Sequence, residues 1–181
     1  PALSVAQAQG LTATQLTAMD ADDLRKLSTT QWSALRSTQI AGLSTTAAAS
    51  LDAERLAQLS PSQLAGLSAS VLSALDATRV SALSTSQIAA LTATQLRGLS
   101  AEDMADFSPT QIAAIGASQL AALPTTDVAA LSASQVAALG AGQIKAMAPS
   151  QISALRPSQL GGLSASQLAA LSSVQIGALS V

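Results

Sequence analysis

The chain has 181 residues, of which 49% are hydrophobic and only 10% charged, and its formal net charge is −2. It contains no His and no Cys, which excludes the commonest general base, the usual neutral metal ligand, thiolate catalysis and disulfides. Eight Lys and Arg residues in all argue against a nucleic-acid-binding surface. No run of about 18 apolar residues is present, so we expect no insertion into a membrane.

A repeat of eight residues runs through the chain without an insertion. Counted from Leu3 in steps of eight, all 23 positions are large and apolar, and we name this position a. Position f, five residues later, is large and apolar in all but two of 22 repeats, which carry Ala8 and Ala48. The consensus is Leu-Ser-Ala-Ser/Thr-Gln-Leu/Ile-Ala-Ala. We call this unit an octad and letter its positions a to h.

A period of eight excludes one long regular element. A continuous α-helix turns about 100° per residue, so position a would drift by about 80° per octad and form no stripe. In a β-strand, positions a and f would point to opposite faces because they are five residues apart. Each octad should therefore form a short element of its own.

The polar positions of the octad predict a helix start. Position b is Ser, Thr or Asp in 17 of 23 octads, and position e is Gln in 15 of 22. This spacing is typical of a capping box, in which the two side chains bond to each other's backbone N–H groups. Four prolines (Pro61, Pro109, Pro149 and Pro157) fall at position c, the first helical position, where Pro costs no hydrogen bond. Each octad thus predicts one helix of about six residues.

Such short helices are unstable alone, so we expect them to bury each other's apolar side chains in a solenoid. The predicted fold is an all-α superhelix of about 22 very short capped helices, with a and f inward and Ser, Thr and Gln at the helix starts and the outer surface. Residues 1–181 form one continuous array, expected to be a segment of a longer one. The alternatives are a disordered tract, a bundle of long helices, and octads paired into 16-residue hairpins. The number of octads per superhelical turn stays open.

Taken in chain order, the exceptions to the consensus are the candidate sites. Two acidic groups, Asp20, Asp22, Asp23 and Glu102, Asp103, Asp106, could hold Ca²⁺. The competing interpretation is that they sit at the cap and first turn of helices, where acidic groups favour the helix dipole.

Other departures carry little chemistry. Without His, only Lys26 and Lys145 could activate a Ser. Octad 43–50 has Ala47 and Ala48 in place of Gln and the large f residue, which indicates a weak point, a bend or neutral drift. Arg36, Pro124, Ala148 and Arg156 stand at position b in place of the usual cap residue. Each loss should cost about 1 kcal/mol. Trp32, at position f, should be buried with a partner for its indole N–H.

Residues 91–99 (Leu-Thr-Ala-Thr-Gln-Leu-Arg-Gly-Leu) and 131–139 (Leu-Ser-Ala-Ser-Gln-Val-Ala-Ala-Leu) resemble octapeptide tracts of long bacterial secreted and surface proteins, including adhesin-like repeat arrays. The resemblance covers essentially the whole chain, and it implies a bacterial origin and an extracellular or cell-surface location. The octad also resembles the first helix of TAL-effector repeats. No second helix of that unit follows, so DNA reading is not implied.

We therefore predict a structural repeat segment, a spacer, stalk or self-assembling scaffold, that is not an enzyme. No catalytic residue, cofactor-binding residue or metal ligand is predicted. The expected partners are further copies of the chain, end to end, or another protein. One alternative function is a protein- or peptide-binding scaffold. A remoter one is binding of ice or polysaccharide through the Ser and Thr hydroxyls at positions b and d, as at Thr12 and Thr14.

Overall fold

The computed structural model describes residues 3–49 and 51–179. Every regular element in these residues is a helix of four to six residues, one per octad, and they contain no strand. The prediction of an all-helical chain with very short helices is confirmed. Neither a disordered tract nor a bundle of long helices agrees with this structure.

Contacts divide the chain into two compact units, Pro1–Leu91 and Thr92–Val181. The first unit holds α1 (Val5–Gly10), α2 (Ala13–Ala18), α3 (Ala21–Arg25), α4 (Thr29–Ser33), α5 (Ser37–Ile40), α6 (Thr45–Ala49), α7 (Ala53–Ala57), α8 (Pro61–Leu64), α9 (Ala69–Leu72), α10 (Ala77–Ser81) and α11 (Thr85–Ala89). The second holds α12 (Ala93–Arg97), α13 (Ala101–Asp106), α14 (Pro109–Ala114), α15 (Ala117–Ala121), α16 (Thr125–Ala130), α17 (Ala133–Ala137), α18 (Ala141–Ala146), α19 (Pro149–Ser153), α20 (Pro157–Leu160), α21 (Ala165–Ala169) and α22 (Ser173–Ala178). The octad spacing of the sequence is the same in both units, and the prediction of one continuous array stays a prediction.

The helices begin where the octad predicts. In α8, the Ser60 hydroxyl accepts from the Gln63 N–H at 3.2 Å, and Gln63 Oε1 accepts from the Ser60 N–H at 2.8 Å. The four prolines at position c are each the first residue of a helix. The capping box thus satisfies N–H groups that a helix start would otherwise leave without partners.

Each helix ends within two helical turns, because the capping residue of the next helix follows directly in the sequence. The N–H of an a residue donates to the carbonyl of the f residue three positions earlier, as from Leu67 to Leu64 at 3.0 Å and from Leu35 to Trp32 at 3.2 Å. The following b residue is already extended, with φ −63° and ψ 156° at Ser60. The a residue therefore closes one helix and precedes the next.

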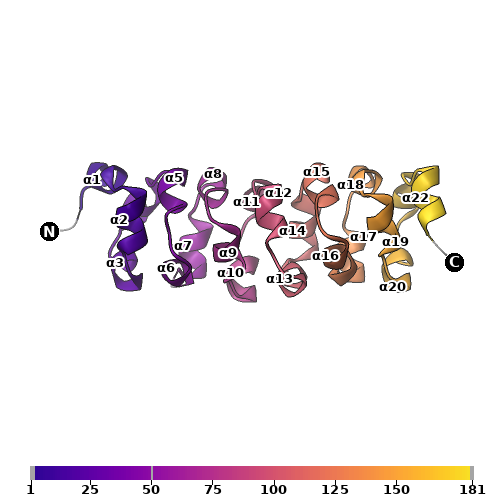
Figure 1. Cartoon of the computed structure of the whole chain (residues 1–181), viewed down its shortest axis with the longest axis horizontal. Coiled ribbons are helices and arrows are strands. Elements are labelled where there is room, and N and C mark those ends of the chain that lie inside the picture. The colour runs from indigo at the N-terminus through magenta and orange to yellow at the C-terminus, as the bar shows by residue number, and fades with distance from the viewer. Residues whose placement is uncertain (1–2, 50, 180–181) are drawn as a thin grey trace. The chain divides into compact units, whose positions relative to one another are not determined.

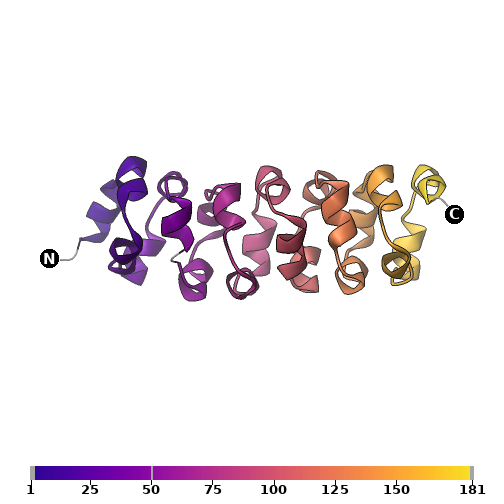
Figure 2. The same ribbon diagram turned by 60° about the horizontal axis from the view of Figure 1, so that its bottom comes forward.

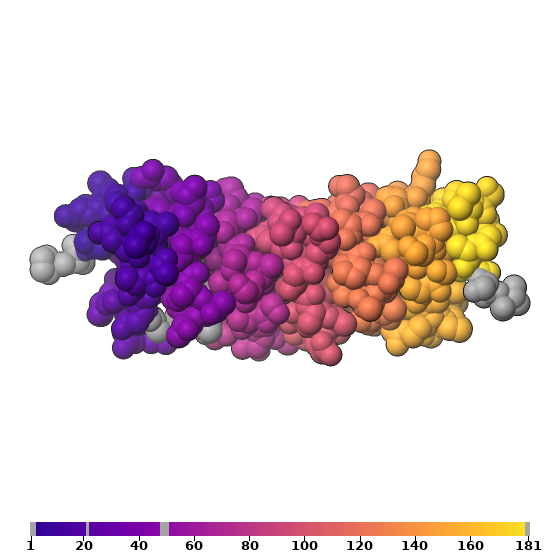
Figure 3. Space-filling view, in the orientation of Figure 1, coloured from indigo at the N-terminus to yellow at the C-terminus, as the bar shows by residue number. Residues whose placement is uncertain are grey.

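Within each unit, helices pack against the third helix along the chain. Examples are α2 with α5 and α5 with α8 in the first unit, and α15 with α18 and α19 with α22 in the second; the views in Figure 1 and Figure 2 show the short coils and the bends between them. One turn of the coil thus takes three octads, or 24 residues. In the space-filling view of Figure 3, the colour changes steadily with residue number along each unit.

The core of each unit consists of the a and f side chains. Leu16, Ile40 and Leu64, at position f, have no exposed surface, and Leu27 and Leu67, at position a, are 3% exposed. Their burial confirms the predicted inward positions, and it stabilises each turn by about 1.5–3 kcal/mol per fully buried large side chain. None of the described helices is long and apolar enough to cross a membrane.

Candidate functional site

The most regular polar feature of the structure is the glutamine at position e, which joins successive turns. Gln63 shows the arrangement. Its Oε1 closes the capping box of its own helix, while its Nε2 donates to the carbonyl oxygens of Leu35 at 2.6 Å, Ser33 at 3.2 Å and Trp32 at 3.3 Å. These acceptors lie 28, 30 and 31 residues earlier, at the end of α4 and in the link to α5, the helix of the preceding turn against which α8 packs. One side-chain amide therefore makes hydrogen bonds in its own turn of the coil and in the preceding turn.

The same contacts recur in both units. The Nε2 atom donates to carbonyls 28 and 31 residues earlier from Gln39, Gln87, Gln135, Gln151, Gln159, Gln167 and Gln175, and 28 and 30 residues earlier from Gln143. Gln31 makes the contact to Leu3. We call this set the glutamine clips.

Sequence reasoning placed the glutamines on the outer surface, and this was wrong. Gln159 has no exposed surface, and Gln87 and Gln135 are 2% exposed. They are buried because their amides must reach carbonyls of the preceding turn, and a buried carbonyl needs a donor. A signal for this was present: a capping box accepts Glu or Gln, yet no e position holds Glu. Only the amide offers both an acceptor and donors.

Arg55 replaces a glutamine clip. Its Nη2 donates to the carbonyls of Leu27 at 2.7 Å and Arg25 at 3.1 Å, the same relative positions that a glutamine reaches. Its guanidinium lies 6.0 Å from the ring centre of Trp32, within the range of a cation–π contact. The Trp32 indole N–H donates to the Arg55 carbonyl at 3.1 Å, which supplies the partner that burial of Trp32 requires.

At three b positions without a capping side chain, one of the two hydrogen bonds of the capping box remains. Arg36, Ala148 and Arg156 have no capping side chain, but their N–H groups still donate to Oε1 of the following glutamine at 2.8, 2.8 and 2.6 Å. In addition, Nη2 of Arg36 donates to the Gln9 carbonyl at 2.5 Å, and Nη2 of Arg156 to the Leu131 carbonyl at 3.0 Å. The two arginines thus lack the capping hydrogen bond and make a hydrogen bond to another turn of the coil.

Pro124 and Asp127 change both halves of the box in α16. Pro124 has no N–H to donate, and Asp127 occupies the e position, 5% exposed. Oδ1 of Asp127 accepts from the Thr126 hydroxyl at 3.1 Å, whereas Oδ2 is buried without a partner among the described residues. Burial raises the pKa of Asp127, and the Thr126 hydrogen bond lowers it by less. A buried carboxylate oxygen without a donor costs folding energy when it is ionised.

The substitution Asp127→Asn should stabilise the chain in a pH-dependent way. Because the folded-state pKa is raised, ionised Asp127 opposes folding above the unfolded-state pKa of about 3.9, and this penalty grows with pH up to the folded-state pKa. We expect the variant to be more stable by on the order of 1 kcal/mol at pH 7 and to lose that advantage at pH 3.5. Urea unfolding at both pH values checks this. An advantage that is equal at both would contradict the ionisation argument.

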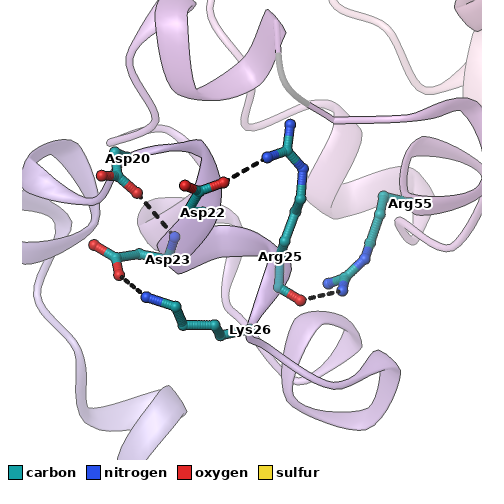
Figure 4. A network of polar contacts seen from close by, with 6 residues as sticks. All are labelled: Asp20, Asp22, Asp23, Arg25, Lys26 and Arg55. Atoms are coloured by element: carbon teal, nitrogen blue, oxygen red, sulfur yellow. Dashed lines mark hydrogen bonds and ion pairs between the residues drawn. The ribbon is translucent and has the colours of Figure 1, made fainter.

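The two acidic groups do not gather into metal sites. Asp20 caps α3 by accepting from the Asp23 N–H at 2.9 Å, while Asp22 pairs with Arg25 at 2.7 Å and Asp23 with Lys26 at 2.9 Å (Figure 4). All four paired side chains are largely exposed, so the pairs contribute little. The Lys26 ion pair lowers the pKa of Asp23, through the hydrogen bond first and charge second.

The second acidic group is likewise part of a helix start. Asp103 takes the place of Gln in the box of α13 and accepts from the Ser100 N–H at 2.7 Å, while Glu102 lies in the first turn of that helix and Asp106 is its last residue. Among the residues that the structure describes, no group of three acidic side chains is placed to hold a metal ion.

The hydroxyls at b and d pair with each other. Ser60 and Ser62 lie 3.2 Å apart, Ser132 and Ser134 2.9 Å, and four further pairs 3.0 Å: Ser68 and Ser70, Ser84 and Ser86, Ser108 and Thr110, and Ser164 and Ser166. Lys26 is paired with Asp23, and Lys145 is exposed. The hydroxyls therefore serve as caps and cap partners.

Octad 43–50 still forms a helix, α6, although it lacks the glutamine. The Ser44 hydroxyl accepts from the Ala47 N–H at 3.1 Å, and Ala47 is 2% exposed. The side chain of Ala48 lies outside the described residues. Nearby, a shallow hollow of about 300 Å³ between α5 and α8 is lined by Ser37, Thr38, Ala41, Ser62, Ala65 and Gly66. These small side chains offer a ligand neither a charge nor an aromatic ring.

Comparison with known families finds a repeat tract. The profile of the ALTTAQ repeat matches residues 112–149, 120–157 and 146–181. The first two matches are displaced by eight residues, which is one octad. No curated protein matches the chain. The matches support a repeat protein, and they name no reaction and no ligand.

Proposed function

We propose that this chain is a structural repeat segment, a solenoid spacer or scaffold without catalysis, in a secreted or surface protein of bacterial origin. The observation that carries the proposal is the use of the polar side chains. The Gln amides link the turns, and the Ser and Thr hydroxyls at position b cap the helices. The abundant polar side chains thus hold the array together. This is expected of a protein whose role is to span a distance.

The absence of His and Cys and the resemblance to octapeptide tracts of secreted and surface proteins support the same proposal. A chain with no thiol needs no particular redox compartment. The matches to the ALTTAQ repeat are compatible with it, because a tract that is recognised in several overlapping registers is an array of equivalent units.

Deleting a whole turn tests the proposal. Removal of residues 132–155, which covers α17, α18 and α19, should leave helix content per residue unchanged, because the cut removes three whole octads and keeps the period of eight unbroken across the junction. The maximum dimension from small-angle X-ray scattering should fall by one helix-to-helix distance, about 8–10 Å. Circular dichroism reports the helix content.

Removal of the single octad 132–139 is the matched control, and it should shorten the particle by about a third as much. Loss of helix after either deletion would contradict the equivalence of the octads. An unchanged maximum dimension with full helix content would contradict the role as a spacer.

A further inference from the structure

Asp127 places a carboxylate inside the second unit. Its side chain is 5% exposed, and Oδ2 is buried without a hydrogen-bond partner in the part of the chain that the structure describes. Pro124, at the start of the same helix, has no N–H that could donate to it. The ion pairs found in the described residues do not include Asp127. A buried carboxylate oxygen of this kind needs a donor or a cation.

The octad register places backbone carbonyls opposite this carboxylate. One octad further on, Gln135 Nε2 donates to the carbonyls 28 and 31 residues earlier, at 2.7 and 3.0 Å. The same offsets from Asp127 lead to Leu99 and Leu96. The two octads have the same setting, because α16 packs against α13 as α17 packs against α14. The Leu99 carbonyl accepts no hydrogen bond from the described residues.

Aspartate cannot replace the amide at this position. Its side chain is one CH₂ group shorter than that of glutamine, and its ionised form has no donor. The place that Nε2 takes in the neighbouring octad is therefore bordered at Asp127 by oxygen atoms alone: Oδ2 and the carbonyls of Leu96 and Leu99. Carboxylate and carbonyl oxygens are the ligands of hard cations. We call this set of three oxygens the α16 site.

We propose that the α16 site binds a monovalent cation of about the size of potassium. One carboxylate balances one positive charge, whereas a divalent ion would leave buried charge without a partner. The Nε2 position in the next octad lies 2.7 and 3.0 Å from the carbonyl oxygens, beyond the distances of about 2.3–2.6 Å that calcium prefers. Backbone carbonyls are also the groups that replace the hydration shell of potassium in selective channels.

No side chain packed around α16 supplies the positive charge instead. Arg97, beside Leu96, is exposed, and Nη2 of Arg156 donates to the Leu131 carbonyl at 3.0 Å. Of the two helices that pack against α16, α13 contributes only acidic charged residues and α19 contributes none. A bound cation would therefore take the place of the amide donor and join α16 to the preceding turn, a property that goes beyond the role of a spacer.

The test is urea unfolding of the 181-residue chain at pH 7, followed by circular dichroism, with potassium chloride replacing tetramethylammonium chloride at constant ionic strength. Tetramethylammonium is too large for the site. A ligand of the folded state stabilises it by RT ln(1 + [L]/Kd), so the unfolding constant should fall about fourfold at about 0.3 M potassium for a Kd on the order of 0.1 M. Ammonium should act like potassium, and sodium should act more weakly.

Two variants separate the site from a general effect of salt. Asp127→Asn keeps the shape and removes the charge, so potassium should not alter its stability relative to tetramethylammonium. The advantage of Asp127→Asn over the parent at pH 7 should accordingly be largest in tetramethylammonium. Asp103→Asn is the matched control. Asp103 also occupies position e, but its carboxylate closes a capping box by accepting from the Ser100 N–H at 2.7 Å. This variant should keep the potassium effect of the parent.

Thallium(I), which is close to potassium in size and visible by NMR, gives a measurement that does not depend on unfolding. Its resonance should broaden in the presence of the parent and of Asp103→Asn, and it should stay sharp with Asp127→Asn.

A parent that is equally stable in potassium and in tetramethylammonium, and that leaves the thallium resonance sharp, would overturn the proposal. That result is expected if a water molecule or a proton satisfies Oδ2. A potassium effect that persists in Asp127→Asn would overturn it as well. Neither outcome affects the turn-deletion result, which tests the spacer role separately.

Discussion

Gly66→Ala should destabilise the first unit by about 3 kcal/mol. A Cβ built on Gly66 would clash with the carbonyl oxygen of Ser37 and would lie 3.0 Å from that of Gln63. Both are backbone atoms that cannot move without shifting α5 or α8, so the substitution overpacks the contact between turns, which costs about 1–3 kcal/mol and occasionally more. No described glycine has a positive φ, so the cost comes from this contact alone. Urea unfolding followed by Trp32 fluorescence measures it.

Gly162→Ala is the matched control. Gly162 occupies the same octad position, h, but its Cβ would meet backbone oxygens only at 3.5 Å and beyond, which is ordinary contact. This variant should match or slightly exceed the parent in stability, because no described glycine has a positive φ, so Ala can adopt the native conformation and lowers the entropy of the unfolded chain. Equal losses in the two variants would show that a general property of glycine at position h, rather than the close approach of α5 and α8, is responsible.

Gln87→Glu should cost about 3–5 kcal/mol, the usual cost of leaving a buried charge without a partner. The side chain is 2% exposed, and its Nε2 donates to Leu59 at 2.7 Å and Leu56 at 2.9 Å. Glutamate has the same shape and can still accept from the Ser84 N–H, which lies 2.8 Å from Oε1. It replaces the donor with a second oxygen that faces two carbonyl oxygens. Urea unfolding followed by Trp32 fluorescence measures this loss as well.

Gln15→Glu is the matched control, because Gln15 closes a capping box and makes no clip to another turn among the described residues. Gln15 also accepts from the backbone and hydroxyl of its cap, Thr12, at 2.8 and 3.2 Å, as Gln87 does from Ser84. It is exposed and donates to no other turn among the described residues. We expect a change within about 0.5 kcal/mol. If Gln15→Glu proved as costly as Gln87→Glu, the capping box rather than the clip would explain both.

The start of each helix could be predicted from the sequence because its causes are local. The residues at b, c and e lie within four positions of each other, and their hydrogen bonds and preferred φ values act whatever the neighbouring turns do. The positions of Pro61 and Pro109 at the first residue of α8 and α14 follow from this.

The number of octads in a turn could not be predicted in this way. It depends on how Leu, Ile and Ala side chains 24 residues apart fit together, and a single repeated pattern is compatible with two, three or more octads per turn. The acceptors of the glutamine clips depend on the number of octads per turn. The burial of residues such as Gln159 was therefore not predicted either. The absence of Glu at position e was the available sign that the amide nitrogen has a function.

The fixed span of the clips has a consequence for synthesis. The glutamine clips join residues 28 to 31 positions apart, however long the array becomes, so the relative contact order falls as octads are added. A turn can close once about thirty more residues have left the ribosome. Folding should therefore keep pace with translation and expose little apolar surface, since nascent chains fold as their units emerge.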